Sequence, residues 1–193
     1  ALSDTTILTP DAWPNQSIYY VLTVWHEGCS TTDTMLVSVS PQPVAAVVSD
    51  TNIICGGDSV QLNASGGLGN ASFTWSPPNG LSDPAASDPM ASPSETTLYS
   101  IVVEENGCID STELEIEVIP RPVPAFVQTQ VAGCAPLSVN FLDLSSDAFN
   151  WVWDFGDGSD VSNLQNPEHE YTTPGLYDAT LTVMGPGGCD AIS

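Results

Sequence analysis

Apolar and polar residues alternate along much of the 193-residue chain, which is the pattern of half-buried β-strands. Leu114, Ile116 and Val118 alternate with glutamates, so this strand has one apolar face and one acidic face. Similar runs are Tyr99, Ile101 and Val103; Val60, Leu62 and Ala64; Trp151, Trp153 and Phe155; and Tyr177, Ala179, Leu181 and Val183. Clusters of Gly, Pro, Asn, Asp and Ser separate the runs. The pattern predicts an all-β protein built from antiparallel β-sandwiches.

The sequence repeats at a shift of 79 residues, which carries Gly28-Cys29 onto Gly107-Cys108 and Cys55 onto Cys134. The repeat predicts three units: 1–42, the back half of one domain; 43–122, a whole domain; and 123–193, a domain that lacks its last strand. Proline-rich boundaries follow, at Pro41-Gln-Pro43 and from Pro120 to Pro124. Such linkers are extended and semi-rigid, so we expect the units to lie end to end in an extended array.

Charge excludes several classes of partner. The chain has 24 acidic residues and one basic residue, Arg121, which gives a formal net charge of −23. A protein that binds nucleic acid needs Lys and Arg to replace phosphate counterions, so nucleic acid is excluded as a partner. No apolar run approaches the roughly 20 residues of a membrane-spanning helix, and we expect no membrane insertion.

The sequence carries no motif for catalysis. Nucleophile elbows, zinc-protease motifs and phosphate-binding glycine loops are absent, and there is no lysine for amine chemistry. We therefore expect no enzymatic activity and no cofactor. A calcium site is the one metal hypothesis, with Asp147, Asp154, Asp157 and Asp160 as oxygen ligands. The alternative is that these carboxylates build turns, and the Asp157-Gly158 step suits a tight β-turn.

Five cysteines in a chain without lysine point to an oxidising, extracellular setting. The repeat places Cys55 and Cys108 at matching ends of one unit, and Cys134 and Cys189 at matching ends of the next. We therefore predict the disulfides Cys55–Cys108 and Cys134–Cys189. The position equivalent to the partner of Cys29 falls before Ala1, so its partner should lie outside this chain, earlier in the same protein or in an adjacent subunit.

The third unit resembles the polycystic kidney disease (PKD) domain, an immunoglobulin-like sandwich. The resemblance rests on Trp153, Asp154, Phe155, Gly156, Asp157, Gly158, Pro167, His169, Tyr171, Pro174, Gly175 and Tyr177. It implies structural roles for these residues, including His169. From the same signature we expect Trp153 and Phe155 to lie in a core, packed against Tyr177, Leu181 and Val183 across the sandwich.

The second unit is similar to immunoglobulin-like repeats in giant surface proteins of gliding bacteria that use type IX secretion. The residues that carry the similarity are Cys55 to Leu62, Thr74 to Pro77, Gly80 to Asp83 and Asn106 to Cys108. It implies a structural or adhesive segment of a long bacterial cell-surface protein or appendage that mediates attachment or gliding. Its partners would be neighbouring repeats, other copies in a filament, and a cell-surface or glycan ligand. The alternative is an accessory carbohydrate-binding or spacer module of a secreted polysaccharide-degrading enzyme.

Overall fold

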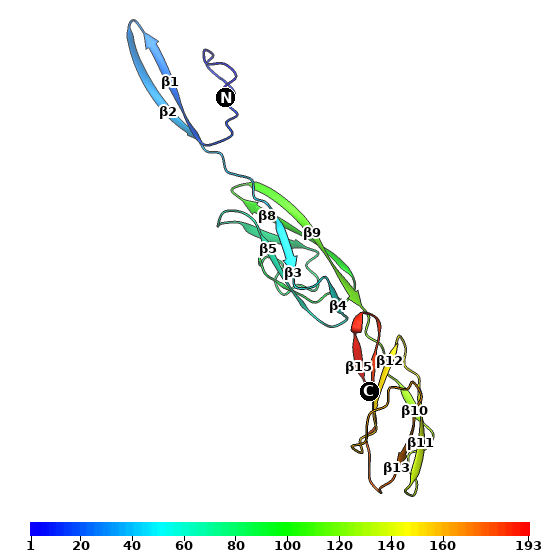
Figure 1. The fold of residues 1–193 in the computed structure, drawn as a ribbon. Helices are drawn as coiled ribbons and strands as arrows, with labels where there is room; N and C mark the ends of the chain where they lie inside the picture. The colour runs from blue at the N-terminus through cyan, green and yellow to red at the C-terminus, as the bar shows by residue number, and fades with distance from the viewer.

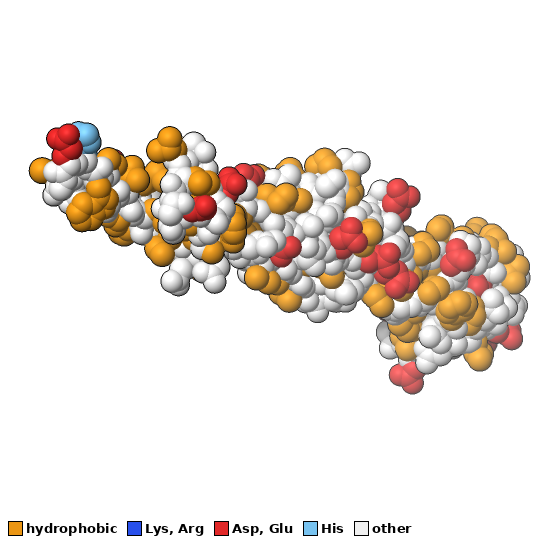
Figure 2. Space-filling model, turned by 90° about the horizontal axis from the view of Figure 1, so that it is seen from above, with side chains coloured by type: hydrophobic (Ala, Val, Ile, Leu, Met, Phe, Trp, Pro, Cys, Tyr) orange, Lys and Arg blue, Asp and Glu red, His pale blue; other side chains and the backbone are white.

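A computed structural model describes residues 1–193, with fifteen β-strands and one short 3-10 helix, η1 (Pro186–Gly188). The three predicted units lie end to end in an elongated array (Figure 1). The space-filling view shows the same shape, with acidic side chains distributed along it (Figure 2). No helix is long and apolar enough to cross a membrane. The protein is all-β, and its second and third units are β-sandwiches, as the alternating pattern predicts.

The first unit contains a single hairpin, formed by β1 (Ile18–His26) and β2 (Cys29–Val37). Glu27 and Gly28 form its turn with positive φ angles of 45° and 82°, a backbone that two-residue hairpin turns require. The apolar side chains of this hairpin are not covered by a second sheet, and Trp25 is 72% exposed. The first unit therefore has no core of its own.

Seven strands form the second unit as two sheets. The sheets have the strand orders β3-β5-β7 and β4-β9-β8-β6. Their bounds are β3 (Ala46–Ser49), β4 (Ile53–Cys55), β5 (Val60–Ser65), β6 (Ser72–Ser76), β7 (Met90–Ala91), β8 (Thr97–Glu105) and β9 (Cys108–Ile119). All neighbouring pairs are antiparallel except β4 and β9, which run parallel with Cys55 opposite Ile119.

The core of the second unit lies between its sheets. Nine side chains are buried there: Ile54, Val60, Leu62, Trp75, Ala91, Tyr99, Ile101, Val103 and Ile116. Leu114, Val118 and Ala64 pack against this cluster and are partly buried, while the glutamates between them on β9 are exposed. The predicted apolar and acidic faces of this strand are thus confirmed.

The third unit also has two sheets, β10-β11-β13 and β12-β14-β15. The bounds are β10 (Phe126–Gln128), β11 (Leu137–Asp143), β12 (Asn150–Asp154), β13 (Glu168–Tyr171), β14 (Thr180–Met184) and β15 (Asp190–Ile192). The third unit ends with β15, which pairs with β14 and has three residues, whereas β9 at the same place in the second unit has twelve.

Aromatic rings fill the core of the third unit. Its buried side chains are Val139, Phe141, Trp153, Phe155, Tyr171, Leu181 and Val183, with Tyr177 partly buried against them. The Trp153 side chain is fully buried, and its ring lies 5.1 Å from that of Phe126 and 5.3 Å from that of Phe141, measured between centroids. Trp153 and Phe155 lie in this core, as predicted. Leu181 and Val183 do not face Trp153 across the sandwich, because they lie on β14, the neighbouring strand of the same sheet, with Leu181 opposite Trp153.

Candidate functional site

The cysteine pairing differs from the prediction. Cys55 of the second unit forms a disulfide with Cys189 of the third unit, with the two Cα atoms 5.6 Å apart. Cys29, Cys108 and Cys134 are free thiols in this chain. The predicted bonds Cys55–Cys108 and Cys134–Cys189 are therefore wrong, and the bond that forms joins two units.

Strand direction explains why the pairing within a unit fails. Cys55 lies opposite Ile119 at the end of β9, whereas Cys108 begins the same strand eleven positions earlier. At about 3.3 Å per residue, this places the two cysteines roughly 36 Å apart. A disulfide needs Cα atoms about 4.4 to 6.8 Å apart, so Cys55 and Cys108 cannot bond. The two cysteines of the second unit thus lie at opposite poles of that unit.

The single basic side chain of the protein lies at the same place. The Arg121 guanidinium donates from Nη2 to Oδ1 of Asp58 at 2.6 Å and from Nε to the carbonyl oxygen of Gly56 at 3.1 Å. Its Nη1 donates to the carbonyl oxygen of Asp190 at 2.7 Å and to the carboxylate of the same residue at 3.3 Å. Arg121 therefore binds both units across the linker that carries it, which we call the second joint (Pro120–Pro122).

Close backbone packing completes the second joint. The N–H of Gly56 donates to the carbonyl oxygen of Ile119 at 2.8 Å. A Cβ atom on Gly185 would lie 2.7 Å from the carbonyl oxygen of Asp147 and 3.2 Å from Cδ of Pro122. Glycine thus allows the third unit to approach the linker. In the sequence, the only sign of the Arg121 contacts was that the single basic residue lies between two prolines of a linker. The net charge of the chain did not indicate them.

Replacing Arg121 with glutamine is expected to loosen the second joint. Because the side chain is about one-third exposed, solvent screening limits the expected loss to about 1 kcal/mol of docking free energy. Small-angle X-ray scattering in the presence of a reductant should show a broader range of interunit distances than in the reduced wild type. The control Glu113→Gln changes an exposed charge on β9 and should leave the scattering unchanged. Identical curves for reduced R121Q and wild type would contradict the role of Arg121.

The PKD-like signature residues form a connected cluster in the third unit. His169 stacks on Phe155 with centroids 4.0 Å apart, and its Nε2 lies 2.8 Å from Oδ2 of Asp157. The Tyr171 hydroxyl donates to the carbonyl oxygen of Phe155 at 3.1 Å, and the ring of Tyr171 stacks on Tyr177 at 4.8 Å. These contacts connect the turn after β12 to β13 and to the segment before β14.

The remaining signature residues shape the backbone. The N–H of Gly156 donates to Oδ1 of Asp154 at 2.9 Å, and φ is 75° at Gly156 and 80° at Gly158. Pro167 is fully buried, and its carbonyl oxygen accepts from the N–H of Phe141. Gly175 leaves room for the ring of Tyr177, and Pro174 is exposed.

Comparison with known proteins finds similarities to one domain family and to solved structures. Residues 119–192 match the PKD domain family. Among solved structures, domains A168–A170 of titin are 14% identical, with 92% of this chain and 71% of that chain covered and a TM-score of 0.38. The three N-terminal domains of the Hoc outer capsid protein of bacteriophage RB49 are 15% identical, with 78% and 57% covered and a TM-score of 0.37.

The hydrogen bonds of Asp157 predict that the third unit loses stability in acid. Hydrogen bonds from the Ser159 hydroxyl, from His169 and from the Ser159 N–H lower the pKa of Asp157 to about 2. In the unfolded chain an aspartate titrates near pH 3.9. The lowered value means that the folded state favours the carboxylate. This stabilisation is complete above about pH 4 and is lost as the pH falls through about 2.

We therefore expect Asp157→Asn to destabilise the PKD domain at pH 6, and the difference from wild type to shrink between about pH 4 and pH 2. Urea unfolding followed by circular dichroism at several pH values measures this. Asp160→Asn is the matched control, because Asp160 is exposed. A stability difference between D157N and wild type that does not change with pH would contradict the assignment.

The calcium candidates do not meet. No group of three or more Asp, Glu, His or Cys side chains is placed to hold a metal ion. Asp154 and Asp157 of the PKD domain instead accept hydrogen bonds from the turn that they build, while Asp147 lies in another loop with a φ of 58°. The four aspartates of the calcium hypothesis, Asp147, Asp154, Asp157 and Asp160, are therefore not brought together, and Asp154 and Asp157 have the turn contacts of the alternative interpretation.

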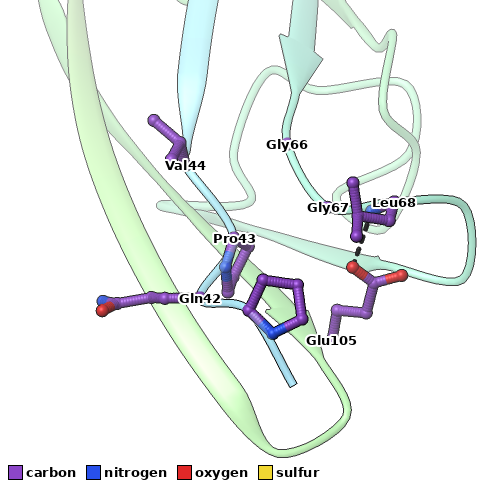
Figure 3. A pocket seen from close by; sticks show the side chains of 8 residues that line it. Gln42, Pro43, Val44, Gly66, Gly67, Leu68 and Glu105 are labelled. Carbon is purple, nitrogen blue, oxygen red and sulfur yellow. Dashed lines mark hydrogen bonds between the residues drawn. The ribbon is translucent and has the colours of Figure 1, made fainter. Parts of the chain in front are cut away.

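A shallow hollow of about 260 Å³ lies where the chain enters the second unit, at the linker Pro41–Pro43, which we call the first joint. Figure 3 shows Glu105 beside the loop of Gly67 and Leu68. The carboxylate of Glu105 is buried and accepts from the N–H groups of Leu68 at 2.6 Å and Asn70 at 3.1 Å. This carboxylate therefore fixes the loop that forms one side of the hollow.

Proposed function

We propose that this chain is a structural segment of a long bacterial cell-surface protein or appendage that mediates attachment or gliding. The observation that carries the proposal is the second joint, where two sandwiches lie end to end and are held by a disulfide and by Arg121 (Figure 1). Interfaces between domains of one chain usually permit relative motion. A covalent joint suits a spacer that must keep its length and direction.

The chemistry of the chain agrees with an extracellular spacer. PKD and immunoglobulin-like domains are typically non-catalytic and extracellular modules. Disulfides persist in oxidising compartments, and the Cys55–Cys189 bond is consistent with such a setting. A net charge of −23 keeps a long array soluble and opposes association between arrays.

Neighbouring units are the proposed main partners. Shifted by 79 residues, β1 falls on β8 and β2 falls on the first nine residues of β9. The Leu2–Ala12 bridge likewise falls on the Leu81–Ala91 bridge. We therefore propose that residues 1–42 are the back half of a unit, whose exposed hairpin is covered in the longer protein as β3 and β5 cover β8 and β9.

Immunogold labelling of intact cells, with antibodies raised against the whole chain, tests this function. We expect label on structures outside the cell, and we expect cells with the gene deleted to attach to a surface or glide less than the parent strain. Permeabilised cells and the deletion strain are the controls for access and specificity. Label confined to the cell interior, or co-purification of the protein with an activity that degrades polysaccharides, would overturn the proposal.

A further inference from the structure

We propose that every joint of the array is closed by the same disulfide, between the first cysteine of one unit and the last cysteine of the next. The first cysteines are Cys55 and Cys134, and the last cysteines are Cys29, Cys108 and Cys189. The inference rests on the proposed function, in that it takes this chain as part of a longer array. It assigns a bonding partner to each of the three thiols that are free in this chain.

The last cysteines occupy equivalent places in the fold. Cys29 and Cys108 each begin the second strand of a hairpin, directly after a turn with two positive φ angles. Cys189 directly precedes β15, which pairs with β14 as β9 pairs with β8. All three therefore mark the end of the unit where the chain enters it, which we call the entry pole.

The first cysteines mark the opposite end, the exit pole. Cys55 lies opposite Ile119, the last residue of β9 before the second joint. Cys134 precedes β11, whose start at Leu137 is opposite Tyr171. The other end of β11 is at the entry pole, because the N–H of Leu144 donates to the carbonyl oxygen of Ala125 near the start of the unit. Cys134 is therefore at the exit pole of the third unit.

The first joint repeats the geometry of the second joint. A shift of 79 residues places Gln42 on Arg121, between prolines in both cases. The Gln42 side chain donates from Nε2 to the carbonyl oxygen of Ile109 at 3.2 Å, just as Arg121 donates to the carbonyl oxygen of Asp190 at 2.7 Å.

Ile109 and Asp190 each directly follow the last cysteine of their unit. Side chains from equivalent linker positions therefore bind equivalent carbonyl groups, and Cys108 stands at the first joint as Cys189 stands at the second. At the second joint the corresponding sulfur is bonded to Cys55.

The partners follow from this register. Cys108 bonds the counterpart of Cys55, which stands 79 positions before Cys55 and precedes Ala1. Cys134 bonds the counterpart of Cys189 in the following unit. Cys29 bonds the first cysteine of the unit that precedes the one to which residues 1–42 belong. Each bond forms when two thiols pass two electrons and two protons to a disulfide of a thiol–disulfide oxidoreductase, which is reduced to two thiols.

A disulfide map of the full-length protein, purified without reductant and blocked with iodoacetamide, tests the proposal. Pepsin is the suitable protease, because the chain has one basic residue and low pH suppresses thiol exchange. We expect Cys55 bonded to Cys189, Cys108 bonded to a peptide from a preceding unit and Cys134 bonded to a peptide from a following unit. Label should be absent from these cysteines before reduction and complete after it.

Either of two results overturns the proposal: a bond from Cys108 to Cys55 or from Cys134 to Cys189, or label on Cys108 or Cys134 before reduction. Cys108→Ser in the full-length protein provides a second measurement, since it should expose one new reactive thiol in the preceding unit and leave Cys55–Cys189 intact. No new thiol in that unit would also overturn the proposal. The cell-labelling experiment does not depend on the disulfide map, so failure of the map leaves the proposed function standing.

Discussion

Replacing Trp153 with alanine is expected to lower the free energy of unfolding of the PKD domain by about 3 to 5 kcal/mol. The indole ring is fully buried among aromatic neighbours, so its removal leaves a cavity that the two sheets cannot close. Its Nε1 also donates to the carbonyl oxygen of Leu164 at 2.9 Å, and that carbonyl would lose its partner. A loss of this size is a large part of the stability of a small domain.

Urea unfolding followed by far-ultraviolet circular dichroism measures this effect without depending on tryptophan fluorescence. Phe149→Ala is the control, because that ring is 63% exposed and its removal should change the free energy of unfolding by less than about 0.5 kcal/mol. Equal effects of W153A and F149A would show that the core of this unit is not organised around Trp153.

Replacing both Cys55 and Cys189 with serine should have the second large effect. The bond closes a loop with a sequence separation of 134, for which the chain-entropy model gives a stabilisation of about 5 kcal/mol. The double variant should therefore unfold at lower urea concentrations, with the second and third units unfolding in separate transitions. Without the bond, only Arg121 and the linker packing hold the two units together.

Differential scanning calorimetry on the oxidised wild type and on C55S/C189S measures the change. For measurements on the 193-residue chain by itself, Cys134→Ser is the matched control, because that thiol is free and exposed there, and its loss should leave the thermogram unaltered. Wild type treated with a reductant should behave like the double variant. A melting profile of C55S/C189S that matches the oxidised wild type would contradict a stabilising role for the bond.

The fold was predictable from the sequence because the alternation of apolar and polar residues shows which face of each strand is buried. Ile116 and its exposed glutamate neighbours show the alternation in one strand, and Trp153 and Phe155 show it in another. The same reasoning failed for the cysteines. A repeat identifies equivalent residues but not the direction in which each strand runs, and the parallel pairing of β4 with β9 decides which pole carries Cys55.

The candidate site was hidden for a related reason. Arg121 was visible in the sequence as the only basic residue, but its partners Asp58 and Asp190 are 63 and 69 positions away. Contacts across two units depend on how the poles meet, which no local pattern records. The four calcium candidates show the reverse case, in which residues close in sequence do not come together in space. These aspartates lie in separate turns and loops.

The bond between Cys55 and Cys189 also determines how the chain carries tension. A pull on the two termini enters along the first joint, reaches Cys55, crosses the sulfur atoms to Cys189 and leaves through β15. The residues between the two cysteines lie off this path, and their extension, roughly 450 Å at about 3.4 Å per residue, is withheld while the bond is intact. With the proposed bond at Cys134, the next loop begins before the previous one closes, so successive loops overlap and no unit can be drawn out by itself. The overlapping disulfide loops then limit the extension of the array, even after hydrogen bonds within a sandwich have broken.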